Sequence, residues 1–224
     1  MELLIIRHAE SRRNMGVTYN LDSTITDEGM SQACRTAAWL YENFKFEGYK
    51  GLVSPYHRTL QTASVLSEVL ETEFCIDDRL AEYRFQNPDV VNIPNRSLLF
   101  QNIAWPNDWL DENERKFHPE AIDLFIDRSF ELLLDLKKSG HDKYILVTHG
   151  VPSVMLSKLA IGDTREEIKQ ECERANKILE SHEVKDFLEE VAKQSSAFIS
   201  GMKNCGMTWI VEEEPMWFSK VVYK

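Results

Sequence analysis

Long hydrophobic runs are missing from this sequence of 224 residues. No apolar stretch approaches the roughly 20 residues that cross a bilayer, so we predict no membrane span. The sequence begins on a strand-like run, residues 2–6, with no basic leader followed by a long apolar stretch. We therefore expect no signal peptide.

Cysteine is also scarce. The four cysteines are scattered and none forms a CxxC pair: Cys34, Cys75, Cys172 and Cys205. Nothing here resembles the disulfide framework of a small secreted domain, so we expect reduced thiols. Together with the missing membrane and export signals, this predicts a soluble cytoplasmic protein.

An excess of basic residues is absent as well. The 26 Lys and Arg residues face 37 Asp and Glu residues, which gives a formal net charge of −11. This balance argues against nucleic-acid or anionic-membrane partners. An anionic substrate would need a local basic pocket, because the net negative charge of the protein repels anions. Internal repeats and low-complexity linkers are missing too, so we expect a single domain over residues 1–224.

The chain does contain alternating strand-like and helix-like segments. Apolar runs typical of buried strands occur at 2–6, 51–53, 74–76 and 144–147. Segments with helical spacing follow: one begins after an N-cap at Thr26, one after Pro55, one at Pro119 and one over Pro152–Leu159. This order predicts an α/β fold, a three-layer α/β/α arrangement with a mainly parallel central sheet.

Two stretches interrupt the alternation. Residues 83–118 combine several prolines with aromatic side chains and are predicted to be an insertion that is a candidate lid over the leaving-group pocket. Residues 163–200 are highly charged and predict a helical excursion with one apolar stripe. Residues 206–211 and 217–223 then predict a closing pair of strands.

Chemically capable side chains follow each of the four predicted strands. The first ends in Arg7 and His8, and Arg58 comes shortly after the second. Glu82 follows the third after a short turn, and His149 follows the fourth. Because open α/β sheets bind ligands at the carboxyl ends of their strands, we expect these side chains to share one pocket.

This set of residue types suits a phosphate group. Arginine forks bind phosphate oxygens, a histidine nitrogen can attack phosphorus, and a glutamic acid can protonate a leaving alkoxide. We predict no metal and no cofactor, because cationic side chains supply the charge. A zinc site made of His8, His57 and His149 is disfavoured, since the two arginines would repel the cation.

Four segments resemble the histidine phosphatase superfamily, also called the phosphoglycerate mutase-like family. They are LLIIRHAES (3–11), SPYHRTLQTA (54–63), LAE (80–82) and VTHG (147–150). The segment ITDEGMSQA (25–33) resembles the family pattern L-T-x-x-G-x-x-Q-A. The match runs in order through the first 85 or so residues and returns at 119–160 and 204–211.

The resemblance implies a phosphoglycerate mutase-like fold and roles for individual residues. His8 would be the nucleophile that becomes phosphorylated, and Glu82 would be the general acid and then the general base. Three further catalytic residues, Arg7, Arg58 and His149, would hold the phosphoryl group. The substrate is expected to contact these three and also Asn14 and Gly150.

The implied activity is metal-independent hydrolysis of a small phosphomonoester. A phosphoglycerate mutase-type phosphotransferase and a non-catalytic phosphate-binding module are alternatives. Ala9 stands where many members have glycine, and YRFQNPDV after Glu82 lacks the E-R-H-Y-G of the mutases, which counts against mutase activity. Residues 83–118 carry no motif that names the substrate, and the oligomeric state is left open.

Overall fold

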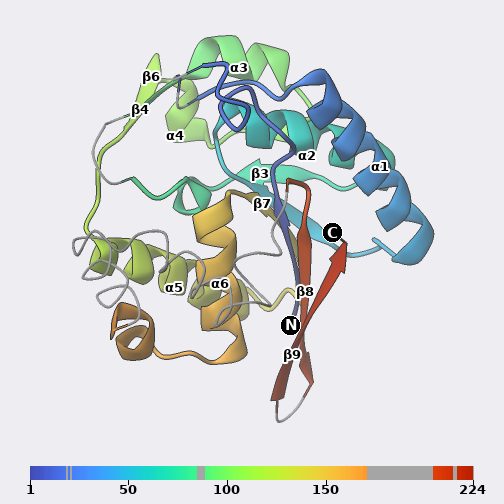
Figure 1. Ribbon diagram of the computed structural model, residues 1–224, viewed down its shortest axis with the longest axis vertical. Coiled ribbons are helices and arrows are strands. Elements are labelled where there is room, and N and C mark those ends of the chain that lie inside the picture. Colours follow the sequence, from blue (N-terminus) through green and yellow to red (C-terminus); the bar gives the residue numbers. More distant parts are fainter. Residues whose placement is uncertain (19, 21, 85–88, 171–203, 214–215, 224) are drawn as a thin grey trace.

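The computed structural model describes residues 1–18, 20, 22–84, 89–170, 204–213 and 216–223 (Figure 1). The greater part of the predicted helical excursion, from residue 171 on, lies outside the described residues. The N-terminal elements are β1 (Glu2–Arg7), α1 (Asp27–Asn43), β2 (Lys50–Val53), α2 (His57–Leu70), β3 (Phe74–Ile76) and the short 3-10 helix η1 (Asp78–Leu80). The later elements are β4 (Asp89–Asn92), α3 (Ile93–Leu99), β5 (Ile103–Ala104), α4 (Asn107–Leu110), β6 (Glu114–Phe117), α5 (Ile122–Lys138), β7 (Lys143–Thr148), α6 (Gly150–Ile161), β8 (Met207–Glu213) and β9 (Met216–Tyr223).

The central sheet has the strand order β5-β3-β2-β7-β1-β8-β9. Strands β3, β2, β7 and β1 run parallel, as predicted, and β5 adds a fifth parallel strand that was not predicted. Strands β8 and β9 close the sheet as an antiparallel pair. In the register, Arg7 pairs with Thr148 and Val53 pairs with Val147. The residues that follow these positions therefore leave the sheet side by side at its carboxyl edge.

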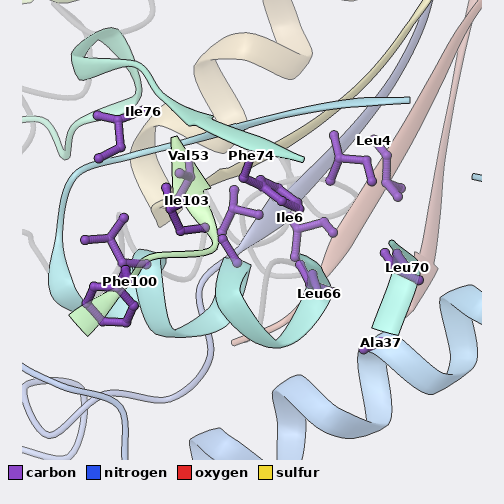
Figure 2. Close-up of a cluster of buried hydrophobic side chains, with 14 of the residues drawn as sticks. Leu4, Ile6, Ala37, Val53, Leu66, Leu70, Phe74, Ile76, Phe100 and Ile103 are labelled. Atoms are coloured by element: carbon purple, nitrogen blue, oxygen red, sulfur yellow. The ribbon is translucent and has the colours of Figure 1, made fainter. Parts of the chain in front are cut away.

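Helices cover both faces of the sheet, with α1 and α2 on one side and α5 and α6 on the other (Figure 1). The alternation of β1 shows how one strand serves both cores. Leu4 and Ile6 pack with the α1 and α2 side chains, and this core is drawn in Figure 2. Leu3 and Ile5 pack instead with α5 and α6. Four consecutive aliphatic residues are thus fully buried because each face of the strand is covered.

The structure confirms one predicted helix start and corrects another. Thr26 is the N-cap of α1, and its side chain accepts a hydrogen bond from the backbone N–H of Gly29 at 2.9 Å. The predicted start of a helix at Pro119 is wrong, because α5 begins at Ile122. Glu120 donates its N–H to the carbonyl of Arg84 and binds Arg128 through its carboxylate, and these contacts hold the chain out of the helix there.

The stretch 83–118 has secondary structure of its own in its described part. Strands β4 and β6 form a separate antiparallel pair, and β5 extends the central sheet beside β3. Phe117 of β6 packs on Tyr56 with ring centroids 5.6 Å apart, so the insertion lies against the start of α2. Across the described residues, no helix is both long and apolar enough to cross a membrane.

Candidate active site

His8 is the first residue after β1, and the backbone on both sides holds it there. Its N–H donates to the carbonyl of Thr148 at 2.9 Å, and its own carbonyl accepts from the N–H of Cys205 at 3.2 Å. The side chain is buried, with only 2% of the residue exposed. The sheet thus presents the imidazole in one fixed orientation.

The hydrogen bonds of His8 define its tautomer. Nδ1 lies 2.7 Å from the carbonyl oxygen of Ala9, which can only accept, so Nδ1 carries the proton. Nε2 therefore has a lone pair, and it accepts a hydrogen bond from Nε of Arg58 at 3.1 Å. Burial lowers the pKa of His8 well below its usual range, and the positive charge of Arg58 lowers it further. A neutral imidazole with a lone pair on Nε2 is the nucleophilic form.

Arg58 connects the two predicted histidines. It lies in the first turn of α2 and is buried, and its Nη2 donates to Nδ1 of His149 at 2.9 Å. The ring centroids of His8 and His149 are 5.3 Å apart in an edge-on arrangement. One guanidinium thus spans side chains that are 141 positions apart in the sequence.

His149 is the N-cap residue of α6 and is fully buried. Because Nδ1 accepts from Arg58, the neutral ring carries its proton on Nε2, which donates to Oγ of Ser54 at 2.7 Å. Burial lowers the pKa of His149 well below its usual range, and the nearby Arg58 charge adds to this effect. Ser54 holds the ring from the end of β2.

Arg7 lies against the start of α6. A Cβ atom built on Gly150 would lie 3.6 Å from Cζ of Arg7, an ordinary contact distance, so the guanidinium passes directly over Gly150. Burial lowers the pKa of Arg7, while the carboxyl of Glu82 opposes that shift. An arginine remains charged in such surroundings, so the pocket retains a strong cation at this position.

Glu82 completes the cluster from a turn rather than from a strand. Its Oε2 lies 3.9 Å from Nδ1 of His149, and its Oε1 accepts from the N–H of Tyr83 at 3.2 Å. Burial raises the pKa of the Glu82 carboxyl, against the opposing charges of Arg58 and Arg7. A carboxyl with a raised pKa keeps its proton to higher pH and can serve as an acid.

The structure thus brings together Arg7, His8, Arg58, Glu82, His149 and Gly150. Asn14 is exposed, and its side-chain oxygen accepts two hydrogen bonds from Ser11, so its contact with phosphate stays a prediction. His57 points to the insertion, with its ring 5.4 Å from that of Phe100. In the part of the chain that the structure describes, no group of three or more His, Cys, Asp or Glu side chains is arranged to hold a metal ion.

Two neighbours of the cluster were not predicted to have a role. Ser54 contacts His149, and its position directly after β2 is the same kind of signal that pointed to His8 after β1. Tyr56 is fully buried, and the centroid of its ring lies 5.0 Å from that of His149. The guanidinium carbon of Arg58 also lies 5.0 Å from the centroid of the Tyr56 ring, as a cation–π contact. The phenol oxygen also accepts a hydrogen bond from Arg84. Tyr56 is the N-cap residue of α2, a position without a local sequence signal for aromatic contacts.

Comparison with known proteins shows the family to which the chain belongs. The sequence profile of the histidine phosphatase superfamily (branch 1) matches residues 3–183. The chain belongs to the histidine phosphatase superfamily, which confirms the predicted family and enzyme class.

A curated relative and several solved structures are similar over most of their length. The relative is the putative phosphoserine phosphatase 2 of Hydrogenobacter thermophilus, 28% identical over 154 residues, which span 66% of this chain and 72% of that protein. The structure of a putative α-ribazole-5′-P phosphatase from Escherichia coli is 18% identical, with a TM-score of 0.61 and coverage of 100% of this chain and 97% of that one. Phosphoserine phosphatase from Entamoeba histolytica, solved with 3-phosphoglyceric acid, is 18% identical with a TM-score of 0.55 and covers 98% of this chain and 94% of its own. These structures confirm the predicted α/β fold.

Proposed function

We propose that this protein hydrolyses a small phosphomonoester without a metal ion, through a phosphohistidine formed on Nε2 of His8. The proposal is supported mainly by the hydrogen bonds of His8, in which Nδ1 lies against the carbonyl oxygen of Ala9 and Nε2 accepts from Nε of Arg58. A phosphate oxygen is a stronger, charged acceptor for the Arg58 guanidinium than an imidazole nitrogen. Substrate binding would therefore draw the guanidinium to phosphate and leave the lone pair for phosphorus.

The first half-reaction forms one bond and breaks one. Nε2 of His8 attacks phosphorus, and the ester P–O bond breaks. The leaving oxygen takes the proton of the Glu82 carboxyl and departs as an alcohol. The hydrogen bond from Nδ1 to the carbonyl of Ala9 stabilises the positive charge that the ring acquires.

The second half-reaction returns the enzyme to its starting state. Glu82, now a carboxylate, takes a proton from water, and the resulting hydroxide attacks the phosphohistidine. The N–P bond breaks, inorganic phosphate leaves, and His8 is again neutral. During both steps Arg7, Arg58 and His149 would stabilise the charge on the equatorial oxygens of the phosphoryl group.

The leaving group is expected to lie toward the insertion 83–118. Phe117 packs on Tyr56 and Phe100 packs on His57, so aromatic side chains from this segment border the residues that flank Arg58. We propose that the segment shapes the leaving-group side of the pocket. The curated relative named as a phosphoserine phosphatase makes phosphoserine the first substrate to test.

A panel of phosphomonoesters tests the proposed function. Purified protein should release inorganic phosphate from at least one of them, and EDTA should leave the rate unchanged. Transfer of the phosphoryl group to a second hydroxyl, without release of phosphate, would instead identify a mutase. Binding of phosphate without any turnover, or activity that disappears with EDTA and returns with a divalent metal, would overturn the proposal.

A further inference from the structure

The turn that carries Glu82 has little backbone support of its own. The short helix η1 ends at Leu80, and Ala81 follows in an extended conformation with φ −60° and ψ 151°. Glu82 comes next, outside any helix or strand. Its carboxyl nevertheless lies in the pocket beside His149, so contacts from elsewhere must hold the turn in place.

Arg128 of α5 supplies contacts on the N-terminal side of Glu82. Its Nη1 donates to the carbonyl of Arg79 at 2.5 Å, and its Nη2 donates to the carbonyl of Ala81 at 3.0 Å. The same guanidinium binds the Glu120 carboxylate, with Nη2 to Oε1 at 2.6 Å and Nε to Oε2 at 2.9 Å. A planar fork can satisfy these acceptors together, which a lysine ammonium cannot do in the same geometry.

Glu120 and Phe125, which both contact Arg128, also contact the chain after Glu82. The N–H of Glu120 donates to the carbonyl of Arg84 at 3.2 Å. The ring of Tyr83 stacks on Phe125 at 4.8 Å between centroids, and the Arg128 guanidinium carbon lies 4.7 Å from the centre of the same Phe125 ring. Arg128 and its partners therefore fix the backbone on both sides of Glu82.

We infer that Arg128 is a positioning residue for the catalytic carboxyl: it holds the turn 79–84 so that Glu82 reaches the leaving oxygen. This inference rests on the proposed role of Glu82 as the general acid. It assigns Arg128 no contact with the substrate, since its donors are directed at backbone carbonyls and Glu120.

The charge of Arg128 adds a second, measurable consequence. Burial raises the pKa of Glu82, while the positive charges of Arg58, Arg7 and Arg128 lower it, and the ring of His149 also faces the carboxyl. Removal of Arg128 takes away one of the opposing charges. The pKa of Glu82 should then rise further, and the loss of activity at high pH should move to higher pH.

The test compares Arg128→Met and Arg128→Lys with a matched control, Arg165→Met. Arg165 also binds a carboxylate, Asp127 at 2.6 Å, and also covers an aromatic ring of α5, Phe130 at 4.1 Å, but it does not bond the Glu82 turn. For Arg128→Met we expect kcat to fall about 10- to 100-fold, the effect of misplacing a catalytic group by about 1 Å, with KM little changed. In Arg128→Met, the fall of kcat/KM at high pH should occur at a higher pH than in the wild type.

The lysine variant separates charge from geometry. Arg128→Lys should keep the high-pH limb near its wild-type position while kcat stays lowered, and Arg165→Met should match the wild type in both. All rates are referred to the folded fraction measured by circular dichroism, so that simple unfolding is not read as a loss of catalysis. Wild-type kcat and pH profile in folded Arg128→Met would overturn the inference.

A further variant, Glu82→Gln, separates a failure of the proposed function from a failure of the positioning role of Arg128. Full activity of Glu82→Gln would mean that the proposed acid is wrong, whatever Arg128 does. Loss of activity in Glu82→Gln together with wild-type behaviour of Arg128→Met would reject the positioning role alone.

Discussion

The candidate site has two halves: a nucleophilic half made of His8, Arg58 and His149, and an acidic half made of Glu82. The fold supports these two halves in different ways. His8 and His149 directly follow β1 and β7, which lie next to each other in the middle of the sheet, and Arg58 lies in the first turn of α2. Glu82 lies in a turn at which side chains from β7 and α5 hold the backbone carbonyls of Leu80 and Ala81. The nucleophilic half is therefore part of the core, whereas the acidic half depends on a few hydrogen bonds.

This difference suggests what each half contributes. A nucleophile and its phosphate-binding partners must be aligned with phosphorus to within a fraction of an ångström, which a buried sheet edge ensures. The acid must also be placed accurately, and side chains of β7 and α5, rather than the sheet, hold the turn that carries it. Substitutions in each half should therefore have different effects on activity.

Replacement of His8 by Ala should remove the proposed nucleophile and lower kcat by about 10⁴-fold or more, because the covalent intermediate can then no longer form on this residue. His57→Ala is the matched control, since His57 is a nearby histidine of α2 whose ring packs on Phe100. The control should stay within a few-fold of the wild type. Initial rates of phosphate release measure both, and equal rates for His8→Ala and the wild type would contradict the account of the nucleophilic half.

Replacement of Glu82 by Gln should lower kcat by about 10²- to 10⁴-fold for an alkyl phosphate, whose leaving oxygen requires a proton. The loss should be smaller for p-nitrophenyl phosphate, whose leaving group is stable as an anion. Glu10→Gln is the control, because that carboxylate accepts from the hydroxyl of Thr26, the N-cap of α1, at 2.7 Å. Equal losses for both substrates would show that Glu82 does not donate the proton.

The pH dependence of kcat/KM should report both halves. The proposed reaction needs neutral His8, whose pKa burial lowers from 6.5, so the low-pH limb should lie below pH 6.5. It also needs protonated Glu82, whose pKa burial raises from 4.5, so the high-pH limb should lie above pH 4.5. Each limb should fall about ten-fold per pH unit. The high-pH limb should disappear in Glu82→Gln, and its persistence there would assign it to another group.

The smallest predicted effect concerns the link between the sheet and the turn. Oγ1 of Thr148 donates to the carbonyl of Leu80 at 2.6 Å in the buried interior. Thr148→Val leaves that carbonyl unsatisfied and should lower the free energy of unfolding by about 1–3 kcal/mol. We expect kcat to fall by less than about ten-fold, since Arg128 still holds the turn. Urea unfolding and kinetics measure the two effects, with Thr148→Ser, which keeps a hydroxyl, as the control.

Much of the fold was predictable because its signals are local. Four of the five parallel strands, β1, β2, β3 and β7, are short apolar runs, and the cap of α1 at Thr26 is encoded within a few residues. Strand β5 was not predicted, because its two residues, Ile103 and Ala104, form a strand only through their pairing with β3. The start of α5 was misplaced for a similar reason, since Glu120 is held by Arg84 and Arg128.

The residues of the candidate site also differ in whether a local sequence signal predicts them. Arg7, His8, Glu82 and His149 could be proposed because each ends a strand, follows one directly or lies in a recognisable motif. The roles of Ser54 and Arg128 depend on contacts across 95 and 47 positions of sequence, and neither residue carries a local pattern that points to its partner. The supporting residues of the site are therefore visible only after the chain has folded.

Trapping of a phosphoenzyme would show whether His8 forms the covalent intermediate. The protein is mixed with ³²P-labelled substrate, quenched, and examined for label that is stable in base and lost in acid, as a phosphohistidine should be. The account predicts such label on the peptide that contains His8 in the wild type and none in His8→Ala. Turnover of the substrate without label in the wild type, or label that persists in His8→Ala, would contradict it.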